Sequence, residues 1–129
     1  MNTSTSFAPA LGRLLLAAIF LISGFGKLAD PAGTIGYISA VGLPLPEFGY
    51  AIAVIVEIAG GLLLIAGYQI RVAALALAVF TVVAALLFHL DFADQNQFIH
   101  LLKNLAIAGG LLQLAVFGAG RFSIEARTA

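Results

Sequence analysis

Apolar residues fill four stretches of the chain, and no regular polar stripe interrupts them. The stretches cover approximately residues 9–28, 48–68, 70–90 and 98–118. Each has about 20 residues, the length at which an α-helix crosses a hydrocarbon core about 30 Å thick. A helix on the surface of a soluble domain would instead carry a polar face that repeats every turn. The pattern therefore predicts four transmembrane helices within a single membrane domain over residues 1–129.

The segment between the first two stretches predicts a further, shorter helix. Asp30 followed by Pro31 is typical of a helix start, and residues 34–41 are too few to cross a bilayer. The turn around Arg71 is tight, so the second and third stretches are predicted to be antiparallel neighbours. The expected fold class is an all-α membrane protein, an antiparallel bundle of four transmembrane helices with a short interfacial helix between the first and second.

Composition supports a lipid environment and excludes several kinds of chemistry. Hydrophobic residues make up 62% of the 129-residue chain and charged residues 9%, whereas soluble domains carry about 25% charged residues. Six basic and six acidic residues give no net charge, and no basic block indicates nucleic acid as a partner. The chain has no cysteine, which excludes a thiol nucleophile and a zinc–thiolate or iron–sulfur site.

The distribution of arginine predicts the orientation in the membrane. Four spans put both termini on the same side, and that side carries Arg13, Arg71, Arg121 and Arg127. The loops of the opposite side carry Asp30, Glu47, Asp91 and Asp94. Basic residues accumulate on the cytoplasmic side of membrane proteins. We therefore expect a multi-pass protein of the cell inner membrane with both termini in the cytoplasm.

Polar residues inside the spans gather toward the outer half of the bundle. Glu57 is expected about 15 Å along its helix from the outer surface, and Lys103 and Asn104 roughly 8–9 Å along theirs. Ionisable residues within a membrane are costly and face the bundle interior. The candidates for ligand binding or proton exchange are Lys27, Glu57, His89, His100, Lys103 and Asn104. Together they predict a polar pocket in the outer half, although no catalytic residue can be named.

An ion pair between Glu57 and Lys103 is the first explanation for a carboxylate at this depth, and a protonated Glu57 is the alternative. Such a pair serves either to hold the bundle together or to carry a proton or anchor a ligand. Glycine pairs are expected where helices pack closely, namely Gly60, Gly61, Gly109 and Gly110. Arg13 is expected to be an interfacial anchor whose side chain extends to the cytoplasmic surface.

The two histidines leave several interpretations open. His89 ends a predicted span beside Asp91, where a histidine needs no special role, and His100 joins the polar cluster. A haem held by both histidines would require them on facing helices at matching depth, and no further motif supports it. A metal site formed by both histidines and the carboxylate of Asp91 or Asp94 is a separate alternative, and no metal is assigned.

Four segments of the chain together resemble the DoxX family: LGRLLLAAIFLISGFGKLADPAG, VEIAGGLLLIAGYQIRVAALAL, HLLKNLAIAGGLLQL and GAGRFSIEA. The order and spacing of their arginines, glycines, Glu57 and Lys103–Asn104 carry the resemblance. It implies a small bacterial inner-membrane protein of four helices. It also implies membrane redox work: oxidation of sulfur compounds that feeds quinones, resistance to quinone or catechol stress, and partnership with soluble antioxidant enzymes.

Three functions are compatible with these observations. The first is an accessory protein in membrane redox or oxidative-stress processes that holds a quinone-like or other small apolar ligand in the outer pocket. The second is a small proton-linked transporter that uses Glu57, and the third is a scaffold for soluble redox enzymes. An oxidoreductase-associated subunit is favoured over a stand-alone enzyme. Quinone is the one cofactor suggested, and a homo-oligomer is possible in a chain this short.

Overall fold

The computed structural model describes residues 3–128, which contain helices and no strand. Four helices are long and apolar enough to cross a membrane. They are α1 (Thr3–Ala29), α3 (Pro46–Ala66), α4 (Ile70–Phe88) and α5 (Gln95–Phe117). Two shorter helices accompany them, α2 (Pro31–Ala40) and α6 (Ile124–Thr128). The prediction of an all-α membrane fold with a short helix between the first two spans is confirmed.

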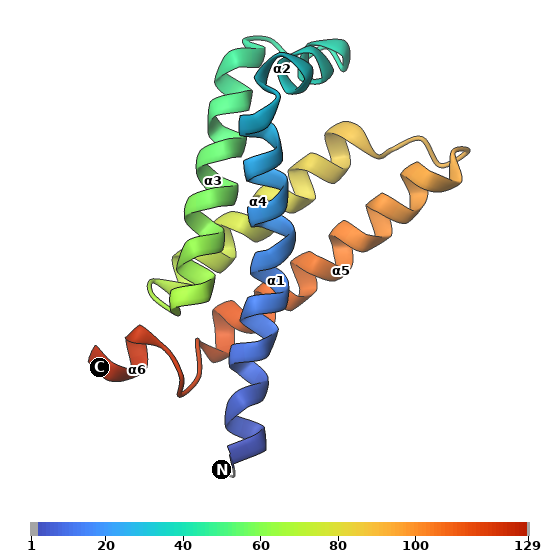
Figure 1. Ribbon diagram of the computed structural model, residues 1–129. Coiled ribbons are helices and arrows are strands. Elements are labelled where there is room, and N and C mark those ends of the chain that lie inside the picture. The colour runs from blue at the N-terminus through green and yellow to red at the C-terminus, as the bar shows by residue number, and fades with distance from the viewer. Residues whose placement is uncertain (1–2, 129) are drawn as a thin grey trace.

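The long helices form two antiparallel pairs. Helix α1 packs along α3, α4 packs along α5, and contacts between α3 and α4 join the pairs. Figure 1 shows the α4–α5 pair inclined across the α1–α3 pair. The pairs meet where α6 and the beginning of α1 lie, which we call the α6 end. They separate toward α2 and the α4–α5 connection, which we call the α2 end (Figure 1).

Local sequence signals set the helix boundaries at the α2 end. The Asp30 side chain caps α2 by accepting a hydrogen bond from the Gly33 amide, and Pro31 occupies the first turn. Helix α2 therefore starts three residues earlier than the predicted range of 34–41. Helix α3 begins at Pro46 after Leu45, whose φ of 51° reverses the chain into the next span.

The packed core lies toward the α6 end. Its largest fully buried side chains are Leu64, Ile70, Leu77 and Leu111, which come from the α6 halves of α3, α4 and α5. Most of the remaining core residues are alanines, and small side chains let helices approach closely. Beyond this layer, toward the α2 end, the helix pairs separate (Figure 1).

Arg13 is buried within the protein instead of extending to the membrane surface. Only 2% of the residue is exposed. Its guanidinium donates hydrogen bonds to the carbonyl oxygens of Leu64 at 2.8 Å, of Ile65 at 3.0 Å, and of Phe122. The expectation that the Arg13 side chain extends to the cytoplasmic surface as an interfacial anchor is therefore wrong: it binds the C-terminal end of α3 and the segment before α6. A cation there also complements the negative end of the helix dipole.

Candidate functional site

A cavity of about 790 Å³ lies between the two helix pairs at the α2 end. Residues from α1 to α5 line it, and most of the lining is apolar. The polar residues predicted from the sequence all line this one cavity: Lys27, Glu57, His89, His100, Lys103 and Asn104. Ligand pockets generally have volumes of about 300–1,000 Å³, with mostly apolar walls and a few convergent polar groups. The cavity has both properties.

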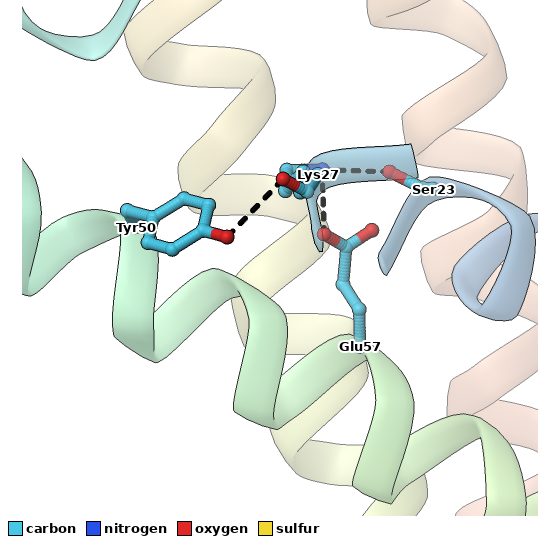
Figure 2. A network of polar contacts seen from close by, with 4 residues as sticks. All are labelled: Ser23, Lys27, Tyr50 and Glu57. Carbon is cyan, nitrogen blue, oxygen red and sulfur yellow. Dashed lines mark hydrogen bonds and ion pairs between the residues drawn. The ribbon is translucent and has the colours of Figure 1, made fainter. Parts of the chain in front are cut away.

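The carboxylate of Glu57 is paired with Lys27. Lys27 Nζ lies 2.6 Å from Glu57 Oε1 and donates a second bond, of 2.7 Å, to Ser23 Oγ. Figure 2 shows Lys27 between these two groups, with the Tyr50 hydroxyl bound to the Lys27 carbonyl oxygen. The Glu57 side chain is 4% exposed and that of Lys27 24%. The predicted pairing of Glu57 with Lys103 is therefore wrong.

The geometry of α1 and α3 explains this choice of partner. Gly24 faces Glu57 so closely that a Cβ on Gly24 would lie 3.3 Å from Glu57 Cβ. Side chains on a helix lean toward its N-terminus. Because α1 and α3 are antiparallel, Lys27 leans from the α2 end toward Glu57, while Glu57 leans toward the α2 end. The two charged groups therefore meet between α1 and α3, where the Lys27 ammonium group also contacts Ser23.

The histidines lie against each other at the edge of the cavity. The rings of His89 and His100 are stacked, with centroids 5.1 Å apart and planes 26° apart. His89 Nδ1 also donates to Gln97 Oε1 at 2.9 Å. A haem between them would require both rings to point a nitrogen at the iron, and stacked rings do not. Within residues 3–128, no group of three or more His, Cys, Asp or Glu side chains is arranged to hold a metal ion.

Thr81 is a lining residue that sequence reasoning missed. Its side-chain hydroxyl is buried and has no hydrogen-bond partner in the described part of the chain, while its backbone oxygen accepts a bond of 3.2 Å from Asn104 Nδ2. The signal was present, because Thr81 is the one polar residue between Arg71 and His89. Nearby, the rings of Tyr37 on α2 and Phe88 on α4 stack 5.1 Å apart and connect the helix pairs at the cavity.

The four glycines expected at close helix contacts behave differently from one another. A Cβ on Gly60 would lie 2.8 Å from Leu77 Cγ, and one on Gly61 would lie 2.8 Å from Leu21 Cγ. Gly110 faces Leu16 at an ordinary distance of 3.6 Å, and Gly109 has nothing within 4 Å. The expectation of close packing is therefore wrong at Gly109. Gly60 and Gly61 let α3 pack closely against α4 and α1, one turn from Glu57 toward the α6 end.

Gly60→Ala is expected to lower the free energy of unfolding by about 1–3 kcal/mol, because the new methyl group overpacks a core in which Leu77 is fully buried. Gly109→Ala is the matched control and is expected to raise it by about 0.5–1 kcal/mol, because alanine in a helix loses less chain entropy. Thermal and denaturant unfolding in one detergent measures both. Equal effects from the two variants would contradict the proposed tight contact at Gly60.

Comparison with known proteins assigns the family. The DoxX family model matches residues 8–90, which include both members of the ion pair and Thr81. The chain belongs to the DoxX family. The resemblance found in the sequence is thus confirmed. Lys103 and Asn104 lie on α5, outside the matched residues.

Curated relatives of this DoxX chain cover α5 as well. Inner membrane protein YqjF of Escherichia coli is 38% identical over 115 residues, which are 89% of this chain and 87% of the relative. Inner membrane protein YphA of the same organism is 32% identical over 123 residues, 91% of this chain and 87% of the relative. No solved structure matches the chain. With its four apolar helices, this DoxX protein is an integral, multi-pass inner-membrane protein embedded in the lipid bilayer.

Proposed function

We propose that this DoxX protein binds a small lipid-soluble ligand of the quinone type in the cavity at the α2 end. In this role it is an accessory, oxidoreductase-associated subunit in membrane redox or oxidative-stress processes. The observation that carries the proposal is that six polar side chains from four segments line one largely apolar cavity of about 790 Å³. A single ion pair would suffice to tie the helices together, so the additional polar groups favour a binding role.

The polar groups suit a ring that carries oxygen atoms. His100 and Asn104 lie four residues apart on one face of α5, and both line the cavity. Imidazole and amide N–H groups donate hydrogen bonds to carbonyl oxygens. Ile52 and Leu87 also line the cavity and are exposed, so the apolar tail of a ligand has side chains to contact on its way into the bilayer.

A binding role agrees better with the core than proton-linked transport does. Below Glu57, fully buried Leu64, Leu77 and Leu111 form an apolar layer between the cavity and the α6 end. Proton transfer across a membrane uses chains of polar groups, and the side chains of this layer are apolar. The chain has no cysteine, so any thiol chemistry belongs to a soluble redox partner. Cytoplasmic termini, soluble redox partners and a homo-oligomer remain parts of the proposal.

Direct binding of a short-chain benzoquinone tests this function. Wild-type protein in detergent is expected to bind it, and His100→Ala and Asn104→Ala are each expected to weaken binding about 2–10-fold through the loss of one hydrogen bond. Asn96→Ala is the matched control, because Asn96 lies on the same helix and is exposed outside the cavity. Isothermal titration on variants with wild-type unfolding transitions gives the affinities.

The absence of binding by wild type would refute the proposal, and so would equal affinities for all variants. Either result would favour a structural role for the polar cluster. Extraction in mild detergent followed by native mass spectrometry offers an independent observation, because a co-purified quinone is expected from the proposal.

A further inference from the structure

The cavity lining carries two lysines and two carboxylates, but only one lysine and one carboxylate of the described residues form an ion pair. Glu57 is paired with Lys27 at 2.6 Å, and Asp30 is exposed at the rim, where its carboxylate caps α2. Lys103 also lines the cavity, yet within the described part of the chain its ammonium group has neither a hydrogen bond nor an ion pair. One cation in the cavity is therefore left without an anion.

The position of Lys103 makes an unpaired charge costly. It is exposed and follows Phe98, where the apolar part of α5 begins, by five positions, which corresponds to about 8 Å along the helix axis. Charged side chains at hydrocarbon depth are rare and pair with one another or with backbone carbonyls. Because no anion within residues 3–128 forms an ion pair with Lys103, an anionic group from outside the chain would stabilise it.

Thr81 provides a second, independent observation. Threonine in a helix often donates to the carbonyl oxygen four residues earlier, but the Thr81 hydroxyl is buried and makes no such bond. Buried polar atoms without a partner are uncommon and require an explanation. The bond from Asn104 to the Thr81 carbonyl oxygen brings α5 against α4 at this level, one residue from Lys103. Lys103 and Thr81, whose hydroxyl lacks a hydrogen-bond partner in the described part of the chain, thus line the same cavity.

We propose that the cavity selects an amphiphile whose head carries an anionic oxygen, with Lys103 as its counter-ion and the Thr81 hydroxyl as a hydrogen-bond donor. This inference rests on the proposed function, since it requires that the cavity bind a small lipid-soluble ligand, and it narrows that ligand to one with an ionised oxygen, which an uncharged quinone lacks. The anionic oxygen belongs either to a small phenol or acid or to the head group of an anionic lipid. The apolar body of the ligand lies against residues such as Phe80 and Leu87.

An alkyl nitrophenol is a suitable probe, because its ionised form absorbs visible light and its neutral form does not. Wild-type protein in neutral detergent is expected to bind the ionised form about tenfold or more tightly than the neutral form, since a cation within a few ångströms favours the charged state of an acid. At a pH where the free probe is half ionised, adding protein therefore increases the visible absorbance.

Variants at Lys103 and Thr81 test whether these residues cause the preference for the ionised probe. Lys103→Met is expected to abolish the increase, Lys103→Arg to retain it, and Thr81→Val to weaken binding of the ionised form several-fold. Arg71→Met is the matched control, because Arg71 is an exposed cation at the α6 end and its loss should change nothing. Lys103→Met is expected to fold, since Lys103 is exposed and makes no contact that the fold requires.

Competition identifies the source of the anion. Displacement of the probe by phosphatidylglycerol, but not by phosphatidylcholine, supports an anionic lipid head, whereas no displacement by either supports a small phenol or acid. Equal binding of both probe forms by wild type, or an unchanged preference in Lys103→Met, overturns the inference. Benzoquinone binding by wild type, together with no preference for the ionised form of the probe, overturns the inference and leaves the proposed function intact. Probe binding without quinone binding supports the anion site and refutes the quinone proposal.

Discussion

Replacing Lys27 by methionine is expected to lower the free energy of unfolding of the detergent-solubilised protein by about 3–5 kcal/mol, because it leaves a buried carboxylate without its counter-ion. The Glu57 side chain is only 4% exposed. Glu57→Gln is expected to have a smaller effect, since Lys27 keeps its bond to Ser23 and is 24% exposed. Denaturant unfolding measures both losses.

The double variant decides whether the two residues act as a pair. Lys27→Met combined with Glu57→Gln leaves no unpaired charge, so its loss should be well below the sum of the single losses. Glu47→Gln is the control, because Glu47 is an exposed carboxylate on the same helix, and such a change is usually within about 0.5 kcal/mol. Strictly additive losses, or coupling of Glu57 to Lys103 instead, would show that the pairing in Figure 2 does not determine stability.

The depth of each polar residue could be predicted from the sequence, because the rise of a helix is fixed. Counting residues from the helix ends placed Glu57, His100, Lys103 and Asn104 toward one end of the bundle, and all four line the cavity there. Depth alone does not say which way a side chain faces or which helix lies beside it. The prediction that Lys103 pairs with Glu57 is wrong for this reason. Helix α1 packs along α3 and brings Lys27 to Glu57, whereas Lys103 is on α5, which belongs to the other helix pair.

The tertiary roles of two other residues could not be predicted because each depends on chain segments far away in sequence. Thr81 carries neither a charge nor an imidazole, so nothing in the sequence beyond a lone hydroxyl marks it as a site residue; its significance comes from burial of its hydroxyl without a hydrogen-bond partner in the described part of the chain. Arg13 looked like a surface anchor because its partners are backbone carbonyl oxygens, which have no signature in the sequence. One of them, on Phe122, is 109 residues away.

The segment that follows α5 is connected to the end of α3 and to the start of α4. Arg13 of α1 makes the first connection, because it donates hydrogen bonds both to carbonyl oxygens in the last turn of α3 and to that of Phe122. Glu125 makes the second, because its Oε1 accepts a bond of 2.7 Å from the Ile70 amide at the start of α4. A cation at a helix C-terminus and an anion at an N-terminus both complement the helix dipole. Gly67, with a φ of 68°, makes the tight turn between these helices, and a Cβ there would lie 2.6 Å from Arg13 Nη1.

Arg13→Met is therefore expected to release this C-terminal segment, with cleavage by trypsin after exposed Arg121 as the readout. A hydrogen bond to a charged group contributes about 1.5–3 kcal/mol, so the loss of the bond to Phe122 should raise the rate of cleavage about tenfold or more. Arg13→Lys should give an intermediate rate, because an ammonium group lacks the planar fork that reaches several carbonyl oxygens at once.

Arg71→Met is the control for this experiment, because Arg71 is exposed at the same end of the molecule and holds none of these carbonyl oxygens. Its cleavage rate should equal that of wild type. Unchanged cleavage in Arg13→Met would mean that the stacking of Phe7 on Phe122, at 4.8 Å, and the bond from the Glu125 amide to the Gly67 carbonyl oxygen retain the segment without Arg13. Faster cleavage in Arg13→Met, with no change in Arg71→Met, would show that the hydrogen bonds of the buried Arg13 guanidinium hold the C-terminal segment against α3.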